Sequence, residues 1–303
     1  MSEHVTHTAV LEDCFNLMFA SDGINPAFKE AGRKYPHFAQ FGSVTRSGDR
    51  FTINLLKDYR GRWESRTPED KLDYKLAFIL GWLSHRAADR QMKPVFREAE
   101  PESTQFPTDC SVYHDAFIFS ELYTNHANSP FHFQLASFEN GIASLPVSAE
   151  FNMKAVTDFY RILHQRALIE MHTFIPDTDD IEGWMDKLYA RHQEQIIQLE
   201  RYAEAVVSPD PAKVKRFVVD TNFYDRNEPI LQLTASLRKG GQATGEQLQA
   251  AVNAEPRSHY GNAIKTGFHY IYYASRFFSG VIDEEELRDK LDIGKKGRDG
   301  QSV

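Results

Sequence analysis

The chain has 303 residues and a formal net charge of −8, with 41% apolar and 26% charged residues. These proportions are those of a folded globular protein. The negative charge argues against binding to duplex nucleic acid, which requires clustered positive charge. Cys14 and Cys110 are the two cysteines, so a disulfide framework is excluded.

No segment of the sequence predicts a membrane span or an export signal. The longest strongly apolar run, residues 76–83, is far shorter than the roughly 20 residues that a transmembrane helix needs. The N-terminus lacks the basic start and apolar stretch of a signal peptide. We therefore expect a cytoplasmic protein without a transmembrane segment. Its oligomeric state has no signature in the sequence.

Helical periodicity dominates the first part of the chain. Apolar residues at spacings of three and four predict a helix over residues 7–20. A second helix is predicted over residues 67–92, because residues 67–70 combine an N-cap, a proline and two acidic residues. Its centre is apolar on all sides, which is typical of a helix in the middle of a protein. We expect Pro94 to end it, and a third helix over residues 109–125.

The remaining pattern is also helical. We expect loops over residues 41–49 and 139–149, and a weak strand pattern covers residues 51–55. The further helices are predicted at residues 150–174, 179–207, 210–220, 227–238, 244–253 and 260–278. The prediction is an all-α, compact multi-helix bundle with long central buried helices. It forms a single domain over residues 1–293, followed by a disordered tail over residues 294–303.

His85 and Asp89 give the strongest chemical signal. Residues at positions i and i+4 project from one face of a helix, so this pair can bind one metal ion together. The same stripe continues backwards through Gly81 and Ala77, whose small size leaves room for another helix, or for an ion and substrate. A hydrogen bond between His85 and Asp89 that braces the core is an equally good interpretation of the pair alone.

Other candidate ligands lie on the neighbouring predicted elements. His114 and Glu121 are seven residues apart, which is close to two helical turns, so they share a stripe. His7 lies in the first turn of the first helix. Asp49 ends a loop with two glycines, where it serves as a ligand or base, or lies in an ordinary solvated turn. A partly exposed histidine remains the alternative for His114.

The order of these motifs resembles the zinc-dependent phospholipase C family, an all-α fold shared with fungal zinc nucleases. The resemblance covers roughly residues 1–125. It rests on the early His7, on Tyr35-Pro-His-Phe-Ala-Gln-Phe-Gly42 leading to Asp49, on Gly81-Trp-Leu-Ser-His85-Arg-Ala-Ala-Asp89, and on His114 with its neighbours. The resemblance implies a metal site with ligands drawn from His7, Asp49, His85, Asp89, His114 and Glu121.

Three departures from the family pattern shape this expectation. Lys93 stands near the place where family members often have a histidine, and the acidic loop reads Gly48-Asp49 instead of Pro-Asp. The carboxylate that usually follows the histidine of the next helix by four positions is displaced to Glu121. The resemblance therefore implies a reduced site with one or two ions of zinc or another divalent metal, or an inactive descendant.

The activity that this resemblance implies is phosphoester hydrolysis. A bound metal lowers the pKa of its water from about 15.7 toward roughly 7, and the resulting hydroxide attacks phosphorus. Asp49 is the candidate catalytic carboxylate that orients or deprotonates this water. The expected partner is a small-molecule or lipid phosphoester substrate.

Two other functions stay open from the sequence. The adjacent His114 and Asp115, with His85 upstream, fit an HD-type metal phosphohydrolase. Alternatively, the chain is a non-catalytic helical binding protein that keeps a His–Asp pair for packing.

Overall fold

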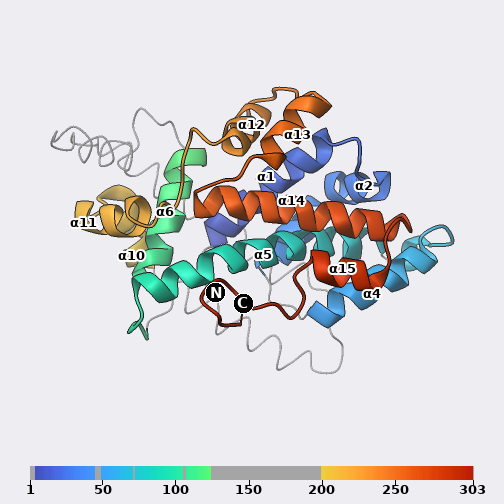
Figure 1. Ribbon diagram of the computed structural model, residues 1–303, viewed down its shortest axis with the longest axis horizontal. Helices are drawn as coiled ribbons and strands as arrows, with labels where there is room; N and C mark the ends of the chain where they lie inside the picture. The colour runs from blue at the N-terminus through green and yellow to red at the C-terminus, as the bar shows by residue number, and fades with distance from the viewer. Residues whose placement is uncertain (1–3, 45–48, 71, 105–106, 124–198, 303) are drawn as a thin grey trace. The chain divides into compact units, whose positions relative to one another are not determined.

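Every regular element that the computed structural model describes is a helix, so the all-α prediction is confirmed (Figure 1). The described residues are 4–44, 49–70, 72–104, 107–123 and 199–302, without the side chains of residues 49–51, 199 and 200. Within these ranges, no helix is both long and apolar enough to cross a membrane. The α-helices are α1 (His4–Ala20), α2 (Pro26–Lys34), α3 (Pro36–Val44), α4 (Asp49–Arg62), α5 (Leu72–Ala99), α6 (Asp109–Tyr123), α10 (Leu199–Val207), α11 (Pro211–Val214), α12 (Pro229–Arg238), α13 (Gly245–Asn253), α14 (His259–Phe278) and α15 (Glu284–Lys290). Short 3₁₀ and π turns cover Pro68–Asp70 and Lys215–Val219.

Local signals in the sequence account for several helix starts. The Asn25 side chain accepts a hydrogen bond from the Ala27 backbone N–H at 2.9 Å, with Pro26 at the first position of α2. At α13, Thr244 and Gln247 form a reciprocal capping box. These bonds satisfy backbone donors that have no partner inside the helix.

The chain divides into two compact units. One comprises Met1–Ala9 and Val95–Phe223, and the other comprises Val10–Pro94 and Tyr224–Val303. Each unit is thus built from segments that are distant in the sequence. Helices α1 and α5 each pass from one unit into the other without a break. The single domain over residues 1–293 stays a prediction.

In the first unit, α6 packs against α10 and against the π turn. The buried side of α6 includes His114, whose ring stacks on Phe223 with centroids 3.7 Å apart and an interplanar angle of 6°. At the first position of α6, Asp109 pairs with Arg201 at 2.5 Å and Lys213 at 2.8 Å. These two cations hold the pKa of the Asp109 carboxyl below its usual value, against the opposing effect of burial.

In the second unit, two glycines allow the backbones of α3 and α5 to meet. A Cβ atom at Gly81 would lie 1.8 Å from the Ala39 carbonyl oxygen, and one at Gly42 would lie 2.1 Å from the Phe78 carbonyl oxygen. Any larger residue would therefore force the two helices apart. The expectation that small residues before His85 admit another helix is confirmed.

Helix α5 is the central buried helix that the sequence predicted. Its middle is enclosed on all sides, and its fully or nearly fully buried apolar residues are Leu76, Ala77, Ile79, Leu80, Trp82, Leu83, Ala87, Ala88 and Met92. Helix α14 lies against it, since a Cβ at Gly267 would lie 3.4 Å from Ala87 Cβ.

The expected end of α5 at Pro94 is wrong, because the helix continues to Ala99. A proline inside a helix removes one backbone hydrogen bond and costs about 3 kcal/mol. Burial of the following residue, Val95, which is 2% exposed, offsets part of this cost. The division between the two units falls directly after Pro94.

The weak strand at residues 51–55 is also wrong, because these residues belong to α4. Ile53, Leu56 and Tyr59 are buried at a spacing of three residues, which is a helical face that a five-residue window cannot show. The loop expected over residues 41–49 is helical at both ends, where α3 finishes and α4 starts. The loop over residues 139–149 and the helix over residues 150–174 lie outside the described residues, as does the helix over 179–207 before α10.

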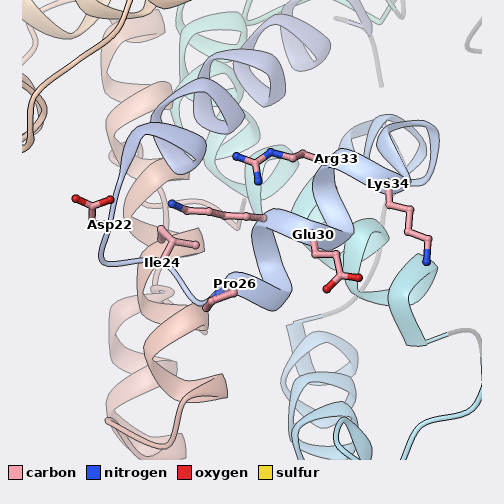
Figure 2. Close-up of a pocket in the computed structure, with 7 residues that line it drawn as sticks. Asp22, Ile24, Pro26, Glu30, Arg33 and Lys34 are labelled. Carbon is pink, nitrogen blue, oxygen red and sulfur yellow. The ribbon is translucent and has the colours of Figure 1, made fainter.

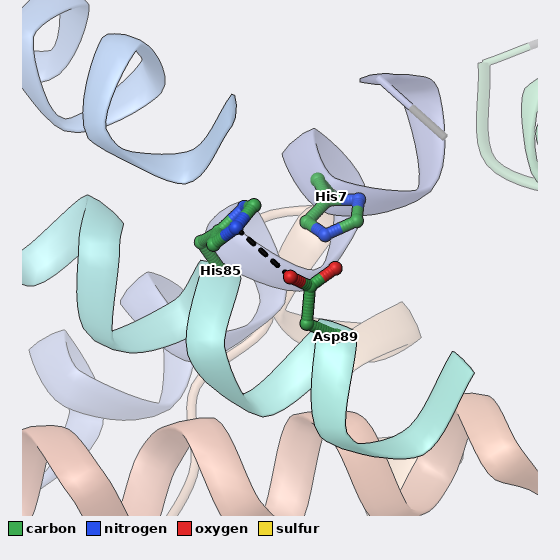
Figure 3. Close-up of side chains that lie close together, drawn as sticks. All are labelled: His7, His85 and Asp89. Atoms are coloured by element: carbon green, nitrogen blue, oxygen red, sulfur yellow. Dashed lines mark ion pairs between the residues drawn. The ribbon is translucent and has the colours of Figure 1, made fainter. Parts of the chain in front are cut away.

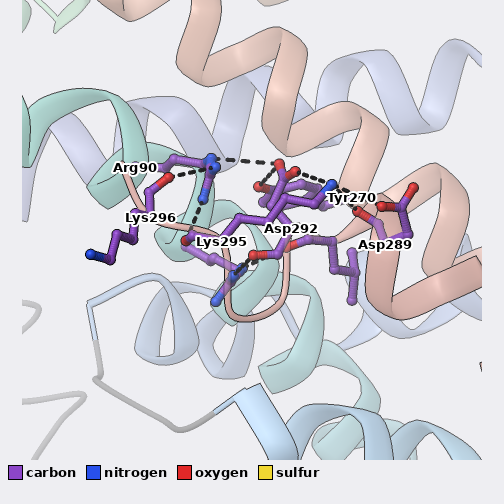
Figure 4. Close-up of polar contacts among 8 residues, drawn as sticks. Arg90, Tyr270, Asp289, Asp292, Lys295 and Lys296 are labelled. Carbon is purple, nitrogen blue, oxygen red and sulfur yellow. Dashed lines mark hydrogen bonds and ion pairs between the residues drawn. The ribbon is translucent and has the colours of Figure 1, made fainter. Parts of the chain in front are cut away.

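The C-terminal segment of the second unit is bonded to α5 (Figure 4). Arg86 donates to the carbonyl oxygens of Leu291 and Asp292 at 2.8 and 2.7 Å. Arg90 donates to the carbonyl oxygens of Lys295 and Lys296 at 3.3 and 3.1 Å. Two arginines of α5 therefore bind a segment for which the sequence predicted disorder from residue 294 onward.

Candidate metal site

The predicted His85–Asp89 pair lies on one buried face of α5. The two residues are 3% and 8% exposed, and His85 Nε2 lies 3.1 Å from Asp89 Oδ2. Both side chains are thus withdrawn from water and directed at each other, as the spacing of four residues predicts.

The second ring nitrogen of His85 fixes which nitrogen carries a proton. His85 Nδ1 lies 3.0 Å from the carbonyl oxygen of Ser43. A carbonyl oxygen only accepts hydrogen bonds, so Nδ1 is the donor. Ser43 lies in the last turn of α3, where carbonyl groups lack partners within the helix. The close approach of α3 and α5 at Gly42 and Gly81 brings this carbonyl group to the imidazole.

This bond determines what faces Asp89. When the imidazole is neutral and Nδ1 holds the proton, Nε2 has a lone pair that points toward a carboxylate oxygen. Two acceptors at 3.1 Å repel each other unless a cation or a second proton lies between them. The pair therefore requires a second proton, on the ring or on the carboxyl group, or a shared cation. Histidines that bind metals typically donate their other N–H to a carbonyl or carboxylate group in the same way.

His7 is a further buried candidate ligand, on the part of α1 that belongs to the first unit. Figure 3 shows the His85 ring and the Asp89 carboxylate of the second unit directed at each other. His7 is 4% exposed and lies in the first turn of α1. Two imidazoles and one carboxylate are a donor set found for zinc and other first-row metals.

The spacing of these atoms can be compared with that of a metal site. Ligand atoms about 2.0–2.1 Å from a tetrahedral ion are about 3.3 Å apart. The 3.1 Å between His85 Nε2 and Asp89 Oδ2 matches this spacing. The donor chemistry and burial thus fit a divalent metal.

Lys93 is the neighbour of this site that sequence reasoning did not assign to it. Lys93 Nζ lies 2.6 Å from Asp89 Oδ2, the same oxygen that faces His85. The Lys93 side chain is 20% exposed and the Asp89 side chain is 11% exposed. Helical spacing contained the signal, since His85, Asp89 and Lys93 follow one another in steps of four.

Comparison with known proteins adds no relative. No family model matches this chain, and no curated protein or solved structure matches it significantly. The interpretation of the site therefore depends on the geometry of its residues.

Two of the sequence candidates, His114 and Glu121, lie on α6 in the first unit. His114 is fully buried, and its Nε2 donates to the Phe217 carbonyl oxygen at 2.8 Å while the ring stacks on Phe223. Glu121 is 7% exposed on the same helix. Their metal-binding role stays a prediction from the resemblance.

The remaining candidates are Asp115 and Asp49. Asp115 Oδ1 accepts hydrogen bonds from both the backbone N–H and the hydroxyl group of Thr6 at 2.8 Å. This carboxylate thereby holds the first turn of α1. Asp49 is the first residue of α4, but its side chain lies outside the described part of the chain. Its catalytic role stays a prediction.

An open depression of about 620 Å³ lies along α2, away from these residues in the sequence (Figure 2). Its lining residues are Asp22, Ile24, Pro26, Lys29, Glu30, Arg33 and Lys34. Lys29 donates to the Phe19 carbonyl oxygen at 3.4 Å, and Arg33 lies 4.8 Å above the Phe19 ring. Because two of the cations already contact Phe19, and acidic residues lie among them, the depression is a poor anion site.

Proposed function

We propose that the chain binds a divalent metal, with zinc as the first candidate, through His85 and Asp89, and that it hydrolyses a phosphoester. His7 is the further ligand that the resemblance implies. One observation carries the metal site: the bond from His85 Nδ1 to Ser43 leaves Nε2 facing Asp89 Oδ2 at 3.1 Å. The substrate class, a small-molecule or lipid phosphoester, comes from the resemblance of the motifs to zinc-dependent phospholipases C.

The metal, when bound, supplies a water molecule whose pKa is lowered toward roughly 7. The residues of this chain would position the metal. Ser43 fixes the ring orientation of His85 by accepting a hydrogen bond from Nδ1, and the close contact of α3 with α5 brings this carbonyl group to the ring. Burial of His85 and Asp89 strengthens their interaction with a cation, because charges attract more strongly where water is excluded.

A non-catalytic function is the second candidate, and Lys93 favours it. Lys93 and an imidazolium form of His85 would together neutralise Asp89 without any metal. The site would then be a polar element of the core. The HD-type alternative receives less support, because His114 and Asp115 are both engaged in contacts that hold helices in place.

Metal analysis of protein purified without chelators tests the proposal. We expect about one equivalent of divalent metal in the wild type, and loss of metal and phosphodiesterase activity in His85→Ala and Asp89→Asn. His37→Ala is the matched control, because His37 is an exposed histidine on α3. The proposal fails if the two site variants retain the metal content of the wild type.

A further inference from the structure

The proposed metal site contains a cation of its own. Lys93 Nζ lies 2.6 Å from Asp89 Oδ2, and His85 Nε2 lies 3.1 Å from the same oxygen. The lysine is one helical turn beyond Asp89 on α5, so its backbone is fixed relative to the pair. The ammonium group and a metal ion therefore compete for the same carboxylate.

Without a metal, the ammonium group compensates a buried charge. Asp89 is 8% exposed, and a carboxylate removed from water is costly unless it is paired and hydrogen-bonded. Lys93 and His85 supply these partners. Removing the lysine charge would leave the carboxylate with less compensation, which is strongly destabilising at buried positions.

With a metal, the same ammonium group opposes binding. Like charges a few ångströms apart repel strongly where water is largely excluded. Lys93 has a flexible four-carbon stem, and its side chain is already 20% exposed, so its head group can move to water. The His85 ring cannot move to water in this way, because it is buried and hydrogen-bonded to the Ser43 carbonyl oxygen.

We propose that Lys93 is a built-in competitor that occupies Asp89 when no metal is bound and lowers the metal affinity of the site. This inference rests on the proposed metal-binding function. Lys93 leaves Asp89 Oδ2 when that oxygen becomes a ligand, and it returns when the metal dissociates. The site thus exchanges its metal reversibly and keeps its fold in both states.

Titration with Co²⁺, followed by visible absorption, tests the competition in Lys93→Met, which keeps an unbranched side chain only one atom shorter and removes its charge. We expect the dissociation constant to fall about tenfold or more relative to the wild type. In the metal-free state, we expect the same variant to unfold several degrees lower than the wild type, because Asp89 loses one of its partners. The variant should thus bind metal more tightly but be less stable without metal. A lysine with a purely structural role would not give this combination.

Two controls accompany this variant. Lys75→Met removes a lysine from the same helix and is expected to match the wild type in both measurements. Lys93→Arg keeps the charge and is expected to keep the weaker affinity. If Lys93→Met is too unstable to study, Lys93→Gln provides a second neutral side chain with a polar end.

The outcomes separate the inference from the proposed function. Equal or weaker Co²⁺ binding by the neutral variants, with clear binding by the wild type, overturns the role of Lys93 and leaves the metal site standing. Absence of binding in the wild type and in both neutral variants overturns both proposals. Binding by the neutral variants alone supports the competition and contradicts metal binding by the wild type.

Discussion

His85 in the second unit and His114 in the first unit are both buried on helices, at 3% and 0% exposure, and both donate to a backbone carbonyl oxygen. Their remaining surroundings differ. The other nitrogen of His85 faces a carboxylate at 3.1 Å, whereas the ring of His114 stacks on Phe223 at 3.7 Å. Burial and a carbonyl partner are therefore common to both, and the group opposite the second nitrogen distinguishes a candidate ligand from a packing residue.

The largest expected effect concerns the helix contact that orients His85. In Gly81→Ala, the new Cβ would lie 1.8 Å from the Ala39 carbonyl oxygen, so α3 and α5 must separate. We expect the free energy of unfolding to fall by upward of about 3 kcal/mol, as in severe overpacking of a core. Urea unfolding measures this change.

Gly61→Ala is the control for this substitution. A Cβ at Gly61 meets no atom within 4 Å, and Gly61 lies within α4. Alanine favours a helix over glycine by about 1 kcal/mol, so we expect this variant to be slightly more stable than the wild type. Equal stability of the two alanine variants would contradict the close contact of α3 with α5 at Gly81.

The next effect separates the two histidines directly. His114→Ala removes a stacked ring and leaves the Phe217 carbonyl group without its donor, so we expect a loss of about 2–3 kcal/mol of stability. Thermal unfolding with and without Zn²⁺ should still show stabilisation by the metal. His85→Ala should lose that stabilisation entirely.

The distinction between the two histidines would be overturned if the two variants showed the reverse pattern. Loss of the Zn²⁺ effect in His114→Ala, with the effect kept in His85→Ala, would transfer the metal site to α6. That result would favour the HD-type function, in which His114 and Asp115 are ligands.

His259 extends the comparison to a histidine that faces a cation, and gives the smallest expected effect. Its Nε2 lies 3.2 Å from Arg298 Nη1, and burial together with the arginine charge lowers the pKa of His259 from 6.5 to about 4. The unfolded chain binds this proton more readily than the folded chain between these values. Stability is therefore lost as the pH falls from 6.5 toward 4.

His259→Gln tests this assignment, because glutamine keeps a polar side chain without titrating. We expect the variant to lose roughly 1–2 kcal/mol less stability than the wild type over this pH range, after allowance for partial exposure of the ring. Denaturant unfolding at pH 7 and pH 4.5 measures the difference. Parallel losses in the two proteins would remove His259 as a source of acid sensitivity.

The sequence predicted the helices because apolar residues recur at helical spacing and polar caps mark the ends. The same local rule placed His85 and Asp89 on one face. It could not reveal that Ser43 lies against His85, because that contact depends on the packing of α3 on α5. It also predicted a helix end at Pro94, where the burial of Val95 offsets part of the local cost of proline.

The contacts of His114 could not be predicted from the local sequence either. His114 lies on a stripe with Glu121, as its spacing predicts, but the Phe217 carbonyl group and the Phe223 ring come from a segment about a hundred residues later. The sequence pattern shows on which face of its own helix a histidine lies. It does not show which residue of a distant segment will contact that histidine.

The bonds from Arg86 and Arg90 to the C-terminal segment have a consequence for the time course of synthesis. The carbonyl group of Leu291 that Arg86 binds lies 205 positions later in the chain. At 5–20 residues per second, a ribosome needs about 10–40 s to make that interval. The part of α5 that contains His85 and Asp89 is therefore synthesised well before the C-terminal segment that accepts hydrogen bonds from Arg86 and Arg90. During that interval a nascent chain presents these side chains without the four hydrogen bonds that Arg86 and Arg90 make in the finished protein.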